Sequence, residues 1–106
     1  MGTRYDGFTV RIISRKTLRT FWEKHAGAKG PMTAWYDHVE RASWRTTQDI
    51  KNDFRSADFV GNNRVVFDIG GNNYRIVVVA LLNAGTLYVR FVGTHAEYRK
   101  IDATKV

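Results

Sequence analysis

The stretch RVVFDIGGNNYRIVVVALLNAGTLYVRFVG, residues 64–93, decides the fold because its hydrophobic residues recur with a period of two. That period is typical of β-strands, and it predicts three of them, at 64–69, 74–82 and 86–92. The segments between them, rich in glycine and asparagine, fit the turns of β-hairpins. The stretch therefore predicts an antiparallel sheet.

The lengths of the two turns predict which side chains share a face of that sheet. A loop of two or four residues at 70–73 sets Asp68 opposite Arg75, and an even-length second loop brings Arg90 to the Arg75 face. An odd-length second loop would place Arg90 on the apolar face, where burying an unpaired charge is costly. We therefore expect an apolar face, which packs on helices, with Val65, Phe67, Ile69, Tyr74, Ile76, Val78, Ala80, Leu87, Val89 and Phe91. The mixed face carries Arg64, Asp68, Arg75, Tyr88 and Arg90.

The residues before this stretch have a helical period after one short strand. FTVRII, residues 8–13, predicts that strand, and Ser14 is a suitable N-cap for the helix that follows. The helix has an apolar stripe at helical spacing, formed by Leu18, Phe21, Trp22 and His25. Such a stripe predicts that the helix packs against the sheet.

Two further helices are predicted in the middle of the chain. The segment AGAKGP breaks the first helix, and Pro31 fits the first turn of a second, which we expect to continue to about Trp44. Residues 46–54 predict a short third helix, capped by one of the two threonines at its start, Thr46 or Thr47.

The remaining segments complete an α+β class: two N-terminal helices packed on a small antiparallel β-sheet, with a short C-terminal helix. Residues 55–63 predict a loop, and THAEYRKID, residues 94–102, a short helix or tight turn. We expect residues 1–9 to be a flexible lead and residues 10–106 to form a single domain.

Composition limits the classes of function. The 17 Lys and Arg residues outnumber the 10 Asp and Glu residues and give a net charge of +7, which favours a polyanion or an acidic protein as partner. The absence of cysteine excludes disulfides and thiolate metal sites and suits the cytoplasm. No apolar run reaches the roughly 18 residues of a membrane helix, and the first residues lack the hydrophobic core of an export signal.

The segment YVRFVGTHAEYRK, residues 88–100, carries Arg90, His95 and Tyr98 at the end of the last predicted strand. With Arg75 on the same face, these residues suit RNA cleavage without a metal, in which the ribose 2′-hydroxyl attacks the adjacent phosphate. That reaction needs a base, an acid and cations for the charge that develops on the phosphate. Histidine transfers protons near neutral pH, arginine binds phosphate oxygens, and tyrosine donates a proton or stacks on a base.

Each of these residues also has a structural explanation. Arg75 can simply pair with Asp68, and Arg90 can be a solvated strand residue. Tyr98 can anchor the last helix in the core. Thr94 and Glu97 form the T-x-x-E pattern of a capping box, although Glu97 can also serve as a base.

The remaining basic residues and histidines carry weaker signals. Lys51, Arg55 and Arg64 can contact RNA phosphates, or they can belong to a solvated face. The three histidines lack the spacing of metal ligands, and HAEY is not the H-E-x-x-H motif of zinc proteases. We therefore predict no metal and no cofactor.

Three stretches resemble the HigB-type toxins of the RelE-like superfamily: RIISRKTLRTFWEKH at 11–25, NNRVVFDIGGNNYRIVVVALL at 62–82 and, above all, YVRFVGTHAEYRKID at 88–102. The resemblance implies a compact α+β fold and a toxin of a type II toxin–antitoxin pair. Such toxins cut messenger RNA, usually on the translating ribosome. A HigA-like antitoxin with a helix-turn-helix domain neutralises them, and the complex represses its own operon by binding operator DNA.

The resemblance also implies roles for four residues. Arg75 and Arg90 match the strand arginines that bind phosphate, and His95 and Tyr98 match positions near the scissile phosphate. RelE-like relatives often bring several lysines to the site, whereas Lys51 is the only plausible one here. The assignment of acid and base therefore stays open.

Two rival hypotheses use the same basic surface without chemistry. The chain can be a non-catalytic RNA- or ribosome-binding module. It can also be an interaction protein for an acidic partner, or a toxin homologue that has lost activity. We find no helix-turn-helix signature, which argues against direct DNA binding.

Overall fold

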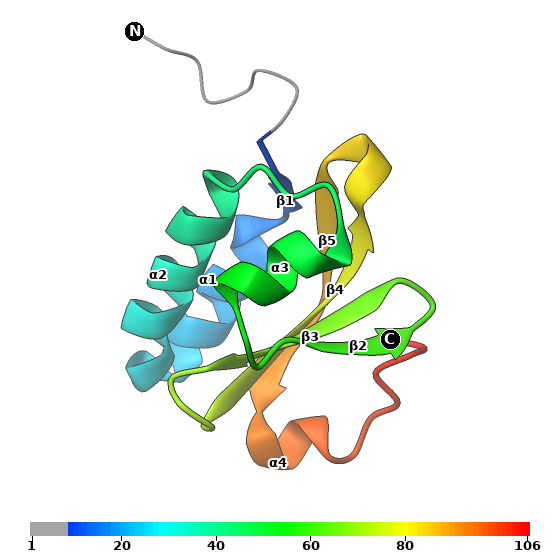
Figure 1. Cartoon of the computed structure of the whole chain (residues 1–106). Coiled ribbons are helices and arrows are strands. Elements are labelled where there is room, and N and C mark those ends of the chain that lie inside the picture. The colour runs from blue at the N-terminus through cyan, green and yellow to red at the C-terminus, as the bar shows by residue number, and fades with distance from the viewer. Residues whose placement is uncertain (1–8) are drawn as a thin grey trace, which may run out of the picture.

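The computed structural model describes residues 9–106, and within them the chain is an α+β domain with one five-stranded sheet (Figure 1). The strands are β1 (Arg11–Ile13), β2 (Asp58–Gly61), β3 (Arg64–Ile69), β4 (Tyr74–Leu81) and β5 (Thr86–Thr94). The helices are α1 (Arg15–Lys24), α2 (Lys29–Glu40), α3 (Thr47–Asp53) and α4 (His95–Tyr98), with short 3-10 turns at Ala26–Ala28 and Leu82–Ala84. The predicted lead at 1–9 lies outside the described residues, apart from Thr9, as does the first residue of the strand predicted at 8–13.

The sheet has the order β1-β5-β4-β3-β2, and the pairing of β3, β4 and β5 confirms the predicted hairpins. The prediction of a purely antiparallel sheet is wrong, because β1 lies parallel to β5, with Arg11 beside Thr86. A parallel pair needs a long crossover connection. Here the connection contains α1, α2, α3 and the other three strands of the sheet. Hydrophobic periodicity and turn residues act over a few positions, so they could not predict this pairing.

The segment predicted as a loop at 55–63 contains the edge strand β2. Phe59 pairs with Val65, and the two strands meet at a tight turn in which Asn62 and Asn63 have φ values of 51° and 62°. Asparagine tolerates this left-handed conformation, which two-residue hairpin turns require. The strand escaped prediction because it is short and irregular, with a bulge between Phe59 and Gly61.

The helices follow the predicted pattern with one change of boundary. Helix α1 begins after Ser14, although the Ser14 side chain makes no capping hydrogen bond, and α3 is capped by Thr46. Helix α2 ends at Glu40 and not near Trp44. The indole N–H of Trp44 instead donates to Asp53 on α3 at 2.8 Å, which requires the chain to leave the α2 axis.

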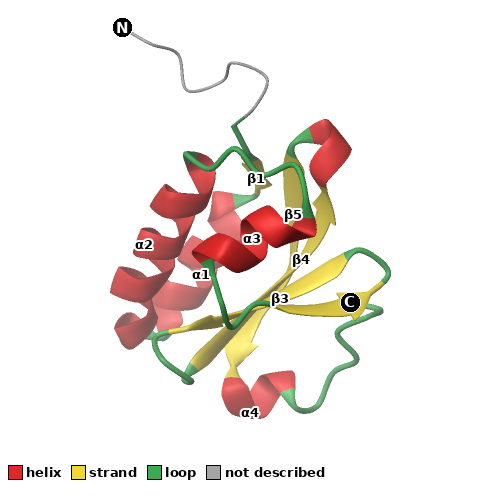
Figure 2. Cartoon of the chain, in the orientation of Figure 1, coloured by secondary structure: helices red, strands yellow, loops and turns green. Residues whose placement is uncertain are grey.

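Helices α1, α2 and α3 cover one face of the sheet and enclose the main core (Figures 1 and 2). Phe67, which is 1% exposed, lies at its centre. Its ring packs edge-on against Trp35 and Phe54, with ring centroids 5.2 and 5.3 Å away, and stacks on Trp44 at 6.2 Å. The predicted apolar face against helices is confirmed by the sheet residues buried in this core, which are Val65, Phe67, Ile69, Ile76, Val78 and Leu87.

The opposite face is covered by α4 and the C-terminal segment 99–106, which returns toward β2 (Figure 2). Phe91 was predicted on the helix-covered face but packs with Val66 and Val77 in this second cluster. The second loop has the expected even length, since Leu81 pairs with Thr86. However, Val77 pairs with Phe91 and Val78 with Val89, so a β-bulge inserts Arg90 and reverses the alternation beyond it.

The capping box of α3 gives a stability prediction. The Thr46 side chain accepts a hydrogen bond from the backbone N–H of Asp49 at 3.2 Å. Thr46→Ala should therefore lower the free energy of unfolding by about 1 kcal/mol. Thr47→Ala is the matched control, because Thr47 is exposed and lies inside the helix. Urea unfolding of both variants measures the difference, and equal losses would contradict the assignment of Thr46 as the cap.

Candidate functional site

Arg75 is the central residue of the candidate site. Its side chain projects from β4 and is only 7% exposed. The register predicted from the hairpin is confirmed, because Arg75 pairs directly with Asp68 on β3. Its Nε lies 3.0 Å from the Asp68 carboxylate, so the predicted ion pair is present.

The two terminal nitrogens of Arg75 are also fully engaged. Nη1 donates to the backbone carbonyls of Asn72 and Tyr74, at 3.2 and 3.1 Å. Nη2 donates to the Asn72 side-chain oxygen at 2.6 Å and lies 2.8 Å from Nδ1 of His95. A guanidinium has five N–H donors, and these contacts account for each of them. A direct contact between Arg75 and a phosphate would have to displace one of these partners.

Helix α4 brings His95 to Arg75. The capping box predicted from T-x-x-E is confirmed: Glu97 N–H donates to Thr94 Oγ1 at 3.1 Å, and Thr94 N–H donates to Glu97 Oε1 at 2.8 Å. The Thr94 backbone N–H is the main cause of the lowered pKa of Glu97. The backbone N–H of His95 donates to the Asn73 carbonyl at 2.9 Å. The start of α4 is therefore held to the turn between β3 and β4.

Tyr98 lies one helical turn after His95 and is half-buried. The Arg75 guanidinium carbon lies 5.7 Å from the centroid of the Tyr98 ring, and Phe91 packs on the same ring at 6.4 Å. Burial is the largest cause of the raised pKa of Tyr98, followed by the charge of Asp58. The phenol therefore keeps its proton at neutral pH and can donate it or share it in a hydrogen bond.

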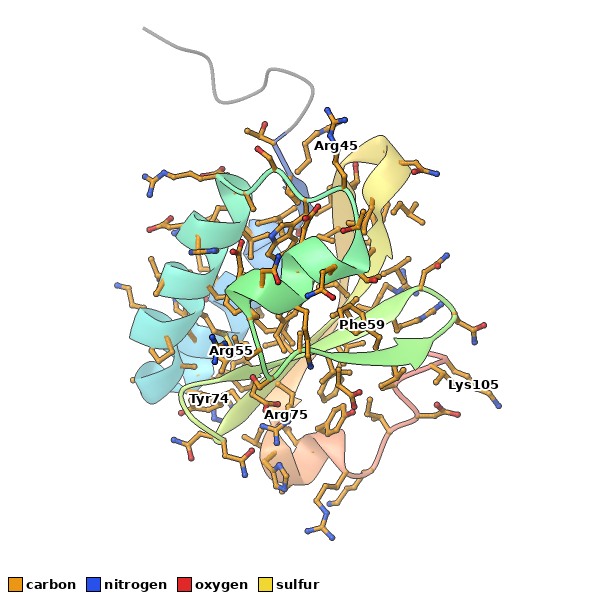
Figure 3. The ribbon with its side chains drawn as sticks, in the orientation of Figure 1. Arg45, Arg55, Phe59, Tyr74, Arg75 and Lys105 are labelled. Carbon is orange, nitrogen blue, oxygen red and sulfur yellow. The ribbon has the colours of Figure 1, made fainter. Side chains whose placement is uncertain are left out.

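We call Asp68, Asn72, Arg75, His95 and Tyr98 the Arg75 cluster (Figure 3 labels Arg75, beside the ribbon of α4). Three of the predicted catalytic residues meet in it. Asn72 was missed, because a glycine- and asparagine-rich turn already explained its presence. The only feature of the sequence that could have indicated this role is that Asn72, whose side chain can accept a hydrogen bond, lies three residues before Arg75.

The other predicted site residues lie outside the Arg75 cluster. Arg90 is exposed at the bulge of β5, and its Nε donates to the Val106 carbonyl at 3.4 Å. Arg64 donates to the same oxygen at 2.6 Å. Lys51 Nζ donates to the Ala57 carbonyl at 2.7 Å, and Arg55 is exposed after α3. No hydrogen bond in the described part of the chain joins any of these four side chains to Arg75.

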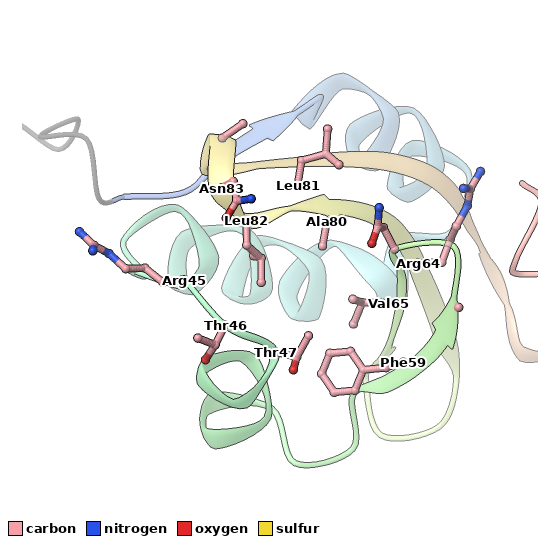
Figure 4. Close-up of a pocket in the computed structure, with 13 residues that line it drawn as sticks. Arg45, Thr46, Thr47, Phe59, Arg64, Val65, Ala80, Leu81, Leu82 and Asn83 are labelled. Atoms are coloured by element: carbon pink, nitrogen blue, oxygen red, sulfur yellow. The ribbon is translucent and has the colours of Figure 1, made fainter.

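A separate cavity of about 590 Å³ opens between the start of α3, the β2–β3 turn and the end of β4 (Figure 4). Its lining includes Phe59, Leu81 and Leu82, with Arg45 and Arg64. The described residues around it include no histidine and no carboxylate. The cavity therefore lacks the groups for proton transfer, whereas the Arg75 cluster has them.

The described residues contain neither a group of side chains suited to a metal ion nor a membrane-spanning helix. Between Thr9 and Val106, no three His, Asp or Glu side chains gather in a way that could hold a metal ion. No helix of the same region is long and apolar enough to cross a membrane.

Known proteins similar to this chain point to one family. The chain is 28% identical over 91 residues to "mRNA interferase toxin HigB" of Escherichia coli (strain K12), covering 84% of this chain and 88% of that protein. The same figures hold for "mRNA interferase HigB" of Shigella flexneri. A further "mRNA interferase HigB", from Escherichia coli O6:H1, is 24% identical over 94 residues, which is 87% of this chain and 91% of that protein.

The family match covers more than half of the chain and includes the whole Arg75 cluster. Residues 28–101 match HigB_toxin, described as the RelE-like toxic component of a toxin–antitoxin system. The resemblance predicted from the three sequence stretches is thereby confirmed. The chain belongs to the HigB toxin family, whose members are the toxic components of toxin–antitoxin systems.

Proposed function

We propose that this protein is an endoribonuclease that cleaves messenger RNA and uses the Arg75 cluster as its active site. The observation that carries the proposal is the meeting of a buried arginine, a histidine and a protonated tyrosine on one end of a basic domain. Membership of a toxin family supports it, as do the relatives named mRNA interferase.

The proposed reaction is an internal transfer at phosphorus. The ribose 2′-oxygen forms a bond to phosphorus while the bond from phosphorus to the 5′-oxygen breaks, which leaves a 2′,3′-cyclic phosphate and a 5′-hydroxyl. The 2′-hydroxyl proton goes to a base, and the 5′-oxygen takes a proton from an acid. His95 and Tyr98 are the proposed groups beside the phosphate, and the positive charge of Arg75 stabilises the negative charge that develops there. No step of this scheme requires a metal ion.

Arg90, Arg64, Lys51 and Arg55 are proposed to bind RNA phosphates outside the reacting centre. Arg90 and Arg64 lie together at the Val106 carbonyl, whereas Lys51 and Arg55 lie on and after α3. Their charges attract the RNA backbone without reading its sequence.

The wider setting is proposed from family membership. The toxin would act in the cytoplasm on messages bound to translating ribosomes, with a RelE-like arrangement of helices and sheet. Its antitoxin would be HigA-like, with a helix-turn-helix domain that carries the pair to operator DNA. The excess of basic residues suits electrostatic pairing with an acidic antitoxin segment.

One observation favours a second candidate function, a non-catalytic RNA- or ribosome-binding module or an inactive toxin homologue. All five N–H groups of Arg75 have partners within the protein, as expected of a structural arginine. The two candidates differ in whether the protein creates new RNA ends.

The first test replaces His95 with alanine. His95→Ala should lower RNA cleavage by at least ~100-fold, the usual scale for a group that acts on the reacting atoms. Purified protein is added to translating ribosomes programmed with a defined message, and primer extension maps the ends. His38→Ala is the matched control, because His38 lies on α2 beside Asp53. New 5′-hydroxyl ends made equally by all three proteins would refute the site, and ribosome binding with no new ends by wild type would favour the binding module.

The second test asks whether the Tyr98 hydroxyl takes part in the reaction. Tyr98→Phe keeps the packing on Phe91 but removes the donor, so kcat should fall by about 100-fold with the affinity for RNA retained. Because the pKa of Tyr98 is raised, wild-type activity should show no loss from ionisation of this phenol up to pH 9. Unchanged kcat in Tyr98→Phe would leave Tyr98 a packing role only.

The third test examines the outlying cations. Arg55→Gln should weaken RNA binding at low salt and reduce the slope of log affinity against log salt by about 0.7, the value for one lost phosphate contact on a single strand. Binding of a labelled RNA across a salt series measures the slope. Arg19→Gln, which removes an exposed positive charge on α1 and changes the net charge by the same amount, is the control for net charge. An unchanged slope in Arg55→Gln would remove Arg55 from the RNA-binding surface.

A further inference from the structure

We propose that Arg75 is a positioning residue that holds His95 in a single neutral tautomer, with its proton on Nε2, and that Asn72 and Asp68 hold Arg75 for this purpose. The proposal rests on the proposed function only where it assigns Nε2 of His95 to RNA. The tautomer itself follows from the contacts within the Arg75 cluster.

The direction of the hydrogen bond between Arg75 and His95 is determined by chemistry. Nη2 of Arg75 lies 2.8 Å from Nδ1 of His95. A guanidinium donates hydrogen bonds and cannot accept them, so Nδ1 must be the acceptor and must carry a lone pair. A neutral imidazole has one proton, which then resides on Nε2.

Arg75 is held too firmly to leave this position at low cost. It is 7% exposed and bonded through Nε to Asp68 and through Nη2 to the Asn72 side chain. Two backbone carbonyls accept the protons of Nη1. Rotating the side chain away would leave these acceptors and a buried charge unpaired, which is strongly unfavourable. The guanidinium therefore presents a fixed N–H to the imidazole.

The turn between β3 and β4 positions both partners of this contact. The side chain of Asn72 accepts from Arg75 Nη2, and the backbone carbonyl of the next residue, Asn73, accepts from the His95 backbone N–H at 2.9 Å. Neighbouring asparagines thus hold the arginine and the start of α4 in the same place. This gives the turn a role beyond connecting two strands.

The tautomer limits what His95 can do in the reaction. With a proton on Nε2, this nitrogen offers an N–H to a phosphate oxygen and has no lone pair to accept the 2′-hydroxyl proton. Acting as that base would require the proton to move to Nδ1, where the Arg75 N–H already points. We therefore assign His95 the role of hydrogen-bond donor to the phosphate, which stabilises the charge of the transition state. In this assignment Tyr98 supplies the proton that the 5′-oxygen takes, and the 2′-hydroxyl proton goes to a water molecule.

Side-chain ¹⁵N NMR of the labelled full chain tests the proposal directly. Long-range ¹H–¹⁵N correlations distinguish the two imidazole tautomers, and His95→Gln identifies the His95 signals by their loss. The spectra are recorded at a pH where the ring is neutral. Wild type should show the proton on Nε2. A proton on Nδ1 of His95, or an even mixture of the two tautomers, would overturn the proposal.

Two turn variants separate positioning from mere structural support. Asn72→Ala removes one acceptor of Nη2, and because Asn72 is exposed the fold should persist. We expect a mixed tautomer signal and a kcat at least ~10-fold lower at unchanged KM, the scale known for partners that orient metal-bound histidines. Asn72→Asp restores an acceptor and should restore both readouts. If Asn72→Ala keeps the wild-type tautomer, Arg75→Met decides the matter, and an unchanged Nε2–H signal in that folded variant would refute the role of Arg75.

The same measurements distinguish failure of this inference from failure of the proposed function. A wild-type protein that has the Nε2–H tautomer but makes no new RNA ends would refute the endoribonuclease and leave the positioning role intact. A protein that cleaves RNA with His95 in the other tautomer would refute the positioning role alone.

Discussion

The interaction on which the α4 end of the molecule depends is the burial of the Arg75 charge. A guanidinium that is 7% exposed is stable only if its donors are satisfied, because water cannot replace a missing partner. Its acceptors come from β3, from the β3–β4 turn, from β4 itself and from α4. One side chain thus joins four parts of the structure, and the placement of His95 and Tyr98 follows from that requirement.

The sheet that carries Arg75 is supported from both faces. On one face the main core around Phe67 packs the sheet against three helices, and on the other the C-terminal segment covers Val66 and Val77. The tail is held at its far end as well, since the Asn62 side chain donates to the Thr104 carbonyl at 3.0 Å. A site whose groups must keep a 2.8 Å contact benefits from such support, because small displacements of oriented groups are costly in catalysis.

The basic residues of this protein are spread more widely than the side chains suited to acid–base catalysis. Arginine and lysine residues lie on α1, in the loops after α2 and α3 and on the strands, whereas the groups suited to acid–base work gather at α4. This division suits a toxin that recognises a long polyanion by its backbone and reacts at one phosphate. It also explains why the two readings of the chain, enzyme and binding module, share most of their residues and differ only in the Arg75 cluster.

Much of this protein was determined by the sequence itself. Period-two alternation and turn residues predicted β3, β4 and β5, and helical spacing with serine or threonine caps predicted α1, α3 and α4. These signals suffice because local backbone preferences and the separation of apolar from polar side chains act within a few residues. The pairing of Asp68 with Arg75 followed from loop length alone. Tertiary structure decided the parallel pairing of β1, the edge strand β2, and the bulge that displaced Arg90 and Phe91. It also decided that Asn72 supports Arg75 and that Arg75 contacts His95, since a hydrogen bond across 20 residues depends on how packed elements meet and leaves no periodic trace in the chain.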